Sequence, residues 1–527
     1  MEKSLIRANY AFDSLGMACV RGLARHCARV VLVDGGMGGR AIRAGVLLGA
    51  GLALGRRLKR EVPEERVGIL LPPGAGGAIA NLGCVLAGKT PVNVNFTSGR
   101  AAAESAVRQA GLRAVITAKS MEEKVGEHFP RVGRKLDLAD LLKKEKKKAV
   151  FWSLLAVVLP ASWLAVVAGI PREGGDREAG LLFTSGSTGE PKGVVLTHRN
   201  ILSNLSQIQG VLGKLNIGSL LGCLPLFHSF GFTVTLWWPL AGGPQVVTYP
   251  SPLDPHALGE VISGHGVELL VTTPTFLRAL MRRAGREKLE GLRMVVTGAE
   301  KLPPSLRDEF AEKIGVKVFE GYGMTEASPV VSVNVPGGER AGSVGKPVGG
   351  MEVRTVDEIS WQVLPSGQAG ILEFKGPNIF PGYLGRADLT EKVLKGGWYH
   401  SADYGRLDGD GFLFIEGRRA RFSKVGGEMV PHGVVEEELA KWCKQKGHGT
   451  EGALEVMVTT VEDERKGESL VVLHVVDLDP VEAERALREA GLPNLWIPKK
   501  FRRVEKIPLL ASGKLDLAAA RKMAQNA

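Results

Sequence analysis

The 527-residue chain is longer than one usual domain, and its 44% hydrophobic and 24% charged residues exclude a disordered or fibrous protein. The formal net charge of +12 predicts an acidic partner such as a nucleotide, an anionic lipid or an acidic protein. Nucleic acid is not expected, because the sequence has no zinc-finger spacing, no basic heptads and no aromatic-and-basic stripe. Five scattered cysteines without a CxxC pair, and no secretory signal at the N-terminus, predict a cytoplasmic protein.

The first elements along the chain alternate between strands and helices. Residues 67–96 read as a strand, a glycine-rich turn, a helix and a strand, and a helix at 101–110 and a strand at 114–117 follow. The same rhythm returns at 267–285 and 292–313. This alternation predicts α/β architecture in which helices connect the strands of layered sheets.

The pattern changes in the last third of the chain. Short strands and turns predict a β-rich subdomain over about 340–416, which completes a large N-terminal α/β domain of residues 1–416. Residues 417–421, GRRAR, are the predicted hinge. Residues 422–527 are predicted to form a small, mobile α+β lid domain.

A charge-free segment interrupts the α/β pattern at about 143–170. Residues 151–169, FWSLLAVVLPASWLAVVAG, follow the lysine-rich run 143–148, and their 19 residues would form a helix of about 28 Å, close to a bilayer core of about 30 Å. A buried core helix is one interpretation. Trp152, Trp163 and the lysines favour membrane contact instead, with the two tryptophans as interfacial anchors.

A single crossing is not expected for this segment, because it would place two parts of one predicted domain on opposite sides of the membrane. Pro160 removes a helix hydrogen bond in its middle. We therefore expect two short apolar arms in the cytoplasmic leaflet, and peripheral association with the inner membrane.

Residues 181–198, LLFTSGSTGEPKGVVLTH, place a loop rich in glycine and hydroxyl groups between two apolar strands. Glycines let backbone amides turn toward an anion, and hydroxyls and a lysine add donors and charge. The lysine is flanked by Pro191 and Gly193, so the loop is not a Walker loop. A linker is the alternative interpretation. The predicted phosphate-binding residues are Thr184, Ser185, Gly186, Ser187, Thr188, Gly189 and Lys192.

The loop TSGSTGEPKG resembles the phosphate loop of the adenylate-forming superfamily of acyl-CoA synthetases, luciferases and peptide-synthetase adenylation domains. Further motifs follow in the superfamily's order: PLFHSFGF (225–232), TGAEKL (297–302), GYGMTEASP (321–329), GWYHSADYGRLDGDGFLFIEGR (397–418) and LLASGKLD (509–516). The resemblance therefore covers nearly the whole chain. It implies ATP and Mg²⁺ as cofactors and an acyl-adenylate intermediate.

Three residues are expected to serve the reaction itself. A carboxylate that attacks the α-phosphate adds negative charge to an anionic group, so catalysis requires positioning and electrostatic stabilisation. By resemblance, Lys514 would bridge the carboxylate and the α-phosphate, Glu326 would hold Mg²⁺, and Thr325 would contact a phosphate oxygen.

Five further residues are expected to bind the nucleoside. Asp403 would accept the ribose hydroxyls, as a carboxylate does in dinucleotide folds, with Arg418 donating beside it. Tyr322 would offer an aromatic face to adenine, and Ala299 and Glu300 would line the adenine site.

Two other residues keep alternative interpretations. His228 would gate the acyl or thiol tunnel, or serve only packing. Lys424 would act in thiol transfer, or be a solvated surface lysine. At the hinge, Ala420 stands where relatives usually carry Asp or Lys, which puts the balance between two lid orientations in question.

Within the superfamily, GRRARFSKVGGEMV and PLLASGKLD resemble the synthetase half of bacterial 2-acylglycerophosphoethanolamine acyltransferase/acyl-[acyl-carrier-protein] synthetases. The expected function is activation of a long-chain fatty acid and its transfer to the phosphopantetheine thiol of acyl carrier protein. The HxxxxD acyltransferase domain of that family is not expected, since the match at His474 and Asp479 lies in a strand-like run. The alternatives are a long-chain acyl-CoA synthetase and a non-catalytic nucleotide-binding membrane scaffold.

Overall fold

A computed structural model describes residues 13–184, 190–418, 421–425, 428–447, 455–463, 467–509 and 515–525. The chain divides into two compact units, each built from several segments. Unit 1 consists of Met1–Val353, Phe374–Tyr399 and Asp410–Leu413, and unit 2 of Arg354–Glu373, His400–Gly409 and Phe414–Ala527. The mixed α/β class expected from the sequence is confirmed. The bounds of the hinge and of the lid stay predictions.

Unit 1 contains a nine-stranded sheet in the order β15-β14-β13-β12-β11-β9-β10-β1-β2. Strands β13 to β1 run parallel to one another, and β2, β14 and β15 pair antiparallel. The strands are β1 Val30–Asp34, β2 Arg40–Arg43, β9 Ser219–Gly222, β10 Gln245–Thr248, β11 Leu269–Thr272, β12 Met294–Thr297, β13 Val318–Gly323, β14 Val330–Val333 and β15 Lys346–Pro347. Strands from both sides of the 143–170 segment therefore share one sheet, which confirms that this segment lies inside a single folded unit.

Unit 1 also contains two smaller sheets. A parallel sheet has the order β4-β3-β5-β6, with β3 Arg66–Ile69, β4 Thr90–Asn93, β5 Ala114–Thr117 and β6 Arg134–Asp137. An antiparallel sheet has the order β18-β8-β7, with β7 Glu178–Thr184, β8 Lys192–Thr197 and β18 Gly382–Tyr383. The strand and helix pattern predicted for residues 67–117 is therefore confirmed.

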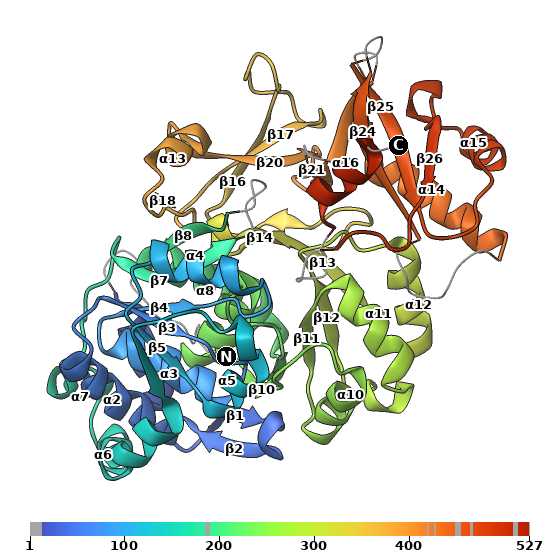
Figure 1. Ribbon diagram of the computed structural model, residues 1–527. Helices are drawn as coiled ribbons and strands as arrows, with labels where there is room; N and C mark the ends of the chain where they lie inside the picture. Colours follow the sequence, from blue (N-terminus) through green and yellow to red (C-terminus); the bar gives the residue numbers. More distant parts are fainter. Residues whose placement is uncertain are drawn as a thin grey trace. The chain divides into compact units, whose positions relative to one another are not determined.

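The helices of unit 1 lie against these sheets and against one another, and α6 packs mainly on α2 (Figure 1). Five of the described helices begin at a residue whose side chain accepts a hydrogen bond from a free backbone amide, and at the start of α8 Thr197 and Asn200 form a capping box. The helices are α1 Leu15–Ala24, α2 Ala44–Glu61, α3 Ala75–Leu86, α4 Arg100–Gln109, α5 Lys119–Val125, α6 Leu138–Val158, α7 Ala161–Ala168, α8 His198–Leu212, α9 Trp238–Leu240, α10 Pro255–Gly264, α11 Pro274–Arg283, α12 Pro304–Ile314 and α13 Ala387–Val393.

The β-rich segment and the C-terminal segment form two five-stranded sheets. The first has the order β16-β17-β20-β19 with β21 beside β20, and the second has the order β23-β22-β25-β24 with β26 beside β25. The bounds are β16 Glu352–Val356, β17 Gly370–Lys375, β19 Leu394–Lys395, β20 Trp398–Leu407, β21 Leu413–Arg418, β22 Phe422–Val425, β23 Glu428–Pro431, β24 Val456–Asp463, β25 Gly467–His474 and β26 Lys500–Arg503. Helices α14 His432–Gln445, α15 Pro480–Glu489 and α16 Leu517–Gln525 belong to unit 2.

The apolar segment 151–169 forms the end of α6 and all of α7, and the chain breaks between them at Pro160, as predicted. No helix in the described part of the chain is long and apolar enough to cross a membrane. Trp152 was expected to be an interfacial anchor, and this expectation is wrong. Its side chain is buried, and the Arg56 guanidinium lies 5.3 Å from its ring centroid. Trp163, in contrast, is 65% exposed.

His198, the buried first residue of α8, binds the start of α1 and makes the stability of unit 1 depend on pH. Nδ1 of His198 accepts a hydrogen bond from the Leu15 backbone N–H at 2.9 Å, which requires a neutral imidazole. Burial lowers the pKa of His198 from 6.5 to about 4. Between these pH values only the unfolded chain takes up the proton, so the free energy of unfolding should fall by about 1.4 kcal/mol per pH unit on acidification.

Urea unfolding at pH 7 and pH 4.5 tests this expectation. His198→Gln keeps an acceptor without a titrating ring, so its free energy of unfolding should depend less on pH across this interval than that of the wild type. An equal loss of stability in both proteins would assign the acid sensitivity to other groups.

Candidate active site

The predicted nucleotide residues of unit 1 follow the carboxyl ends of neighbouring parallel strands. Ala299 and Glu300 come after β12, whereas Tyr322 lies near the end of β13, and Thr325 and Glu326 follow it. Because β12 and β13 pair in parallel, with Thr297 opposite Glu320, these residues leave the sheet at the same edge. Ligands of open α/β sheets bind at this edge. The fold therefore supports a nucleotide site there.

The predicted phosphate loop connects two strands of a hairpin, as expected. Thr184 ends β7 and pairs with Lys192, which begins β8. Ser185, Gly186, Ser187, Thr188 and Gly189 lie outside the described residues. The hairpin fixes both ends of the loop, so its predicted role depends on the positions of Thr184 and Lys192.

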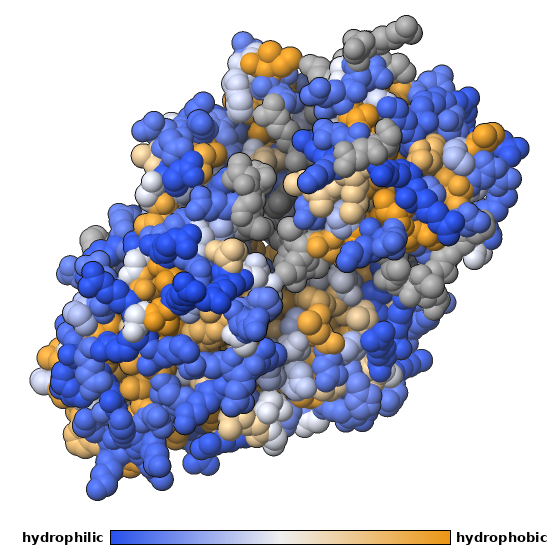
Figure 2. All heavy atoms as spheres, viewed as in Figure 1, coloured by the Kyte–Doolittle hydropathy of each residue, from blue (hydrophilic) through white to orange (hydrophobic). Residues whose placement is uncertain are grey.

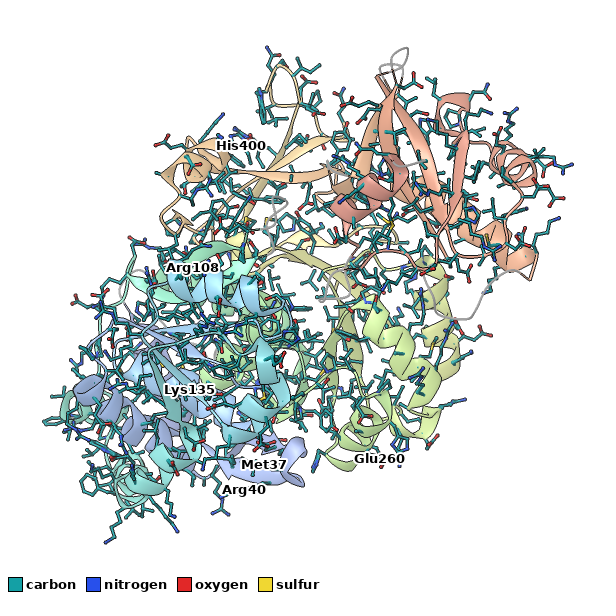
Figure 3. All side chains as sticks on the ribbon, viewed as in Figure 1. Met37, Arg40, Arg108, Lys135, Glu260 and His400 are labelled. Carbon is teal, nitrogen blue, oxygen red and sulfur yellow. The ribbon has the colours of Figure 1, made fainter. Side chains whose placement is uncertain are left out.

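Helix α4 holds the C-terminal end of this loop, a contact that the sequence analysis missed. The Ser105 hydroxyl donates to Glu190 Oε1 at 3.0 Å, and the Gln109 amide donates to the Pro191 carbonyl at 2.9 Å. The same amide donates to Ser105 Oγ at 3.1 Å, which ties the two contacts together. Figure 3 labels Arg108, the neighbour of Gln109, on the helix that lies beside β7 and β8. In the sequence, only the polar residues Ser105 and Gln109 beside the alanines of this helix could have indicated the contact.

Gln109→Ala should therefore raise the KM for ATP about two- to tenfold, since one hydrogen bond contributes about 1 kcal/mol. The KM for the carboxylic acid should stay unchanged. Steady-state kinetics with ATP and acid varied separately checks the split. Arg108→Ala, one position earlier on the exposed side of α4, is the matched control. Equal changes in both KM values would contradict a local effect on the phosphate loop.

The structure brings Lys192 and Glu326 together around Tyr383. The Tyr383 hydroxyl donates to Glu326 Oε1 at 2.8 Å, and Lys192 Nζ lies 5.6 Å from the centre of the tyrosine ring. Burial, followed by the negative charge of Glu326, raises the pKa of Tyr383, so its hydroxyl remains a donor. The pKa of Tyr399 is raised well above its ordinary value by the same causes. Tyr383 was not predicted as a site residue, although it lies in the glycine-flanked sequence FPGYLG.

Thr325 contacts the motif that contains His228. The hydroxyls of Thr325 and Ser229 lie 3.2 Å apart, and Ser229 precedes a π-helix over Phe230–Trp237. π-Helical turns occur often at functional sites. The ring of His228 is half-buried and packs 4.8 Å from the Phe227 ring, so both predicted roles of this histidine stay open. Ser229 is the residue of this motif that the sequence analysis missed.

The expected adenine-side residues have unusual local geometry. Ala299 has a φ of +69°, which an L side chain rarely adopts and which functional sites often contain. Glu300 accepts a hydrogen bond from the Thr275 hydroxyl at 2.7 Å and so holds the first turn of α11. Tyr322 packs its ring 5.8 Å from that of Phe374. The roles of these residues toward adenine stay predictions.

The remaining predicted residues belong to unit 2. Asp403 is buried on β20, and its backbone N–H donates to the Ser401 hydroxyl at 3.1 Å. Arg418 ends β21, and Lys424 pairs with Met429 between β22 and β23. Ala420 and Lys514 lie outside the described residues. The predicted roles of these residues therefore stay predictions.

The donor groups at Glu326 fit a hard cation. Mg²⁺ prefers carboxylate oxygens together with water and phosphate oxygens. Glu326 supplies a carboxylate, one of whose oxygens accepts a hydrogen bond from the Tyr383 hydroxyl, and Thr325 supplies a second oxygen in the adjacent residue. This arrangement can hold a cation that also contacts a nucleotide phosphate.

Comparison with known proteins shows which family this sequence matches. Residues 23–384 match the family described as "AMP-binding enzyme". Among similar proteins, the long-chain-fatty-acid–CoA ligase of Bacillus subtilis is 29% identical over 343 residues, which cover 64% of this chain and 60% of the ligase. The sulfoacetate–CoA ligase of Cupriavidus necator is 29% identical over 463 residues, 86% of each chain. The match thus spans less than two thirds of the Bacillus ligase.

Solved structures show the same fold. The o-succinylbenzoate coenzyme A synthetase of Bacillus subtilis, in complex with ATP and magnesium ion, has a TM-score of 0.78 and 25% identity over 96% of this chain and 99% of that chain. ATP-bound MatB from Rhodopseudomonas palustris has a TM-score of 0.80 and 22% identity over 97% and 99%. Because the family match covers well over half of its residues, the chain belongs to the AMP-binding enzyme family.

Proposed function

We propose that the protein joins a long-chain fatty acid to AMP, releases pyrophosphate, and transfers the acyl group to the phosphopantetheine thiol of acyl carrier protein. The arrangement of Glu326, Tyr383 and Lys192 supports the first part of this proposal, because Tyr383 contacts both the carboxylate proposed to bind the cation and the lysine proposed to bind phosphate. The fatty acid follows from the similarity to long-chain-fatty-acid–CoA ligases, and the carrier protein from the resemblance around GEMV and PLLASGKLD.

The residues divide the work of adenylation. Lys192 and the loop would hold the phosphates, and Glu326 would hold Mg²⁺, which supplies positive charge to the phosphate oxygens when bound. Tyr383 donates to one oxygen of Glu326, and the other oxygen would bind the cation. Thr325, whose hydroxyl lies 3.2 Å from that of Ser229, would contact a phosphate oxygen. Lys514 joins the carboxylate of the acid to the α-phosphate.

The thiol acceptor is tested by running CoA and acyl carrier protein in parallel with a panel of fatty acids. With the net charge of +12, use of the acidic carrier protein should weaken as salt rises, because exposed charges are screened beyond about 8 Å at physiological ionic strength. Efficient use of CoA without use of carrier protein would replace this proposal by a long-chain acyl-CoA synthetase. No pyrophosphate release with any acid would favour a nucleotide-binding membrane scaffold.

A poorly soluble acid also requires a source. The proposal takes this source to be the cytoplasmic leaflet of the inner membrane, with which the protein associates peripherally. The exposed apolar side chains of α6 and α7 support this part of the proposal.

A further inference from the structure

One edge of unit 1 carries an apolar surface made by two short helical arms. Its side chains are each 51% to 79% exposed, and we call this set the apolar edge: Val150, Phe151, Leu154, Val157 and Val158 of α6, and Trp163, Val166 and Val167 of α7. Figure 2 shows apolar and hydrophilic surface side by side at the lower left margin, where Figure 1 places α6 and α7. Apolar surface gathered in this way marks an interaction site rather than ordinary surface.

The opposite faces of the two arms are fully packed, so the apolar edge is not an incomplete part of the core. Trp152 and Ala156 of α6, and Leu164 and Ala165 of α7, are buried. At Gly49 of α2, a Cβ atom would lie 2.5 Å from the Ala149 carbonyl oxygen. Helices α2 and α6 therefore approach closely, which leaves α6 no room to rotate its apolar edge inward.

The N-terminal half of α6 adds positive charge to the same helix. Lys143, Lys144, Lys146, Lys147 and Lys148 are exposed, and the buried Glu145 pairs with Lys148 at 2.8 Å. Steps of four, three and four residues lead from Lys147 through Phe151 and Leu154 to Val158, so lysines and apolar side chains share one face. An anionic lipid surface matches both the lysines and the apolar side chains. An acidic protein would match the lysines alone.

We propose that the apolar edge inserts at the boundary between headgroups and acyl chains of an anionic membrane, with the lysines at headgroup level. The inference deepens the membrane source suggested in the proposed function and rests on it only for the identity of the acid. Trp163 is the interfacial anchor, because its ring is exposed at the start of α7. Such helices insert about 5–10 Å below the surface, which is within reach of these side chains.

Co-sedimentation with phosphatidylglycerol vesicles tests the surface. Leu154→Glu combined with Val157→Glu should lower vesicle binding about tenfold or more, because charges replace inserted apolar side chains. The matched control is Leu253→Glu, since Leu253 is 76% exposed elsewhere in unit 1 and should bind as the wild type does. Phosphatidylcholine vesicles should bind less protein, and Lys143→Gln combined with Lys147→Gln should reduce the difference.

Brominated phospholipids identify which tryptophan inserts. They should quench part of the fluorescence of the wild type and of Trp152→Phe, and distinctly less of Trp163→Phe. Quenching that disappears in Trp152→Phe and persists in Trp163→Phe would overturn the orientation proposed here.

Two results would overturn the proposal as a whole. One is vesicle binding that is equal in the wild type and in the Leu154→Glu, Val157→Glu variant. The other is a dimer, measured by analytical ultracentrifugation, that this variant abolishes while wild-type protein fails to bind vesicles. Pyrophosphate release with a short, soluble acid should be the same in all these variants. Its absence in the wild type would contradict the proposed function and leave the membrane surface intact.

Discussion

Lys514→Ala should lower the rate of acyl-adenylate formation by about 10²- to 10³-fold, the usual cost of removing one group that stabilises developing charge. Thioester formation from a supplied acyl-adenylate should stay close to the wild-type rate. The two rates separate because the lysine is expected to contact the α-phosphate only in the adenylating orientation of the lid. Pyrophosphate release and thiol consumption measure the two half-reactions independently.

Lys506→Ala is a suitable control for this experiment, since this exposed lysine precedes the motif by a few residues in the same region. Both of its half-reactions should remain near the wild-type rates. If Lys514→Ala slows adenylation and thioester formation equally, the lid does not alternate between two orientations.

Glu326→Gln should lower adenylation by about 10²-fold or more at ordinary magnesium concentrations, because a carboxylate is lost where a divalent cation is expected. Added Mg²⁺ should restore part of the rate. Glutamine has nearly the same size and can still accept from the Tyr383 hydroxyl, so the fold should survive. Titration of the rate with Mg²⁺ at saturating ATP measures the effect.

Tyr383→Phe is the companion variant, because it removes the hydroxyl and keeps the buried ring. Its magnesium requirement should rise in the same direction by about tenfold, the lower end of what one hydrogen bond to a charged group contributes. A rate that is independent of Mg²⁺ in Glu326→Gln and in the wild type alike would contradict the assignment of Glu326 to the cation.

The sequence was sufficient for the features that depend on local pattern. Two apolar runs around a glycine-rich loop predicted the β7 and β8 hairpin, and the break at Pro160 followed from the missing backbone donor. The residues that sequence analysis missed act through contacts between segments that lie far apart in the sequence. Ser105 and Gln109 lie some 80 residues before the loop that they hold, and Tyr383 lies 57 residues after Glu326.

Trp152 shows why orientation around a helix was harder to predict. Residues 151–169 are apolar on all sides, so the sequence has no polar face that would indicate which side chains turn inward. The outcome was decided by packing on α2, where small residues permit close approach. Trp163 is also a tryptophan of this apolar segment, but its side chain is exposed whereas that of Trp152 is buried.

The nine-stranded sheet has a consequence for biosynthesis. Strand β1 pairs with β10, so that Leu32 lies opposite Val246, and the ribosome must finish β10 before the edge of that sheet can close. At about 5–20 residues per second, α6 and α7 leave the ribosome several seconds before this partner strand exists. During that interval the nascent chain already exposes its lysines and apolar arms. Synthesis near a bilayer would therefore let the lipid surface shield the apolar arms from aggregation while the strands that will cover the rest of the chain are still being made.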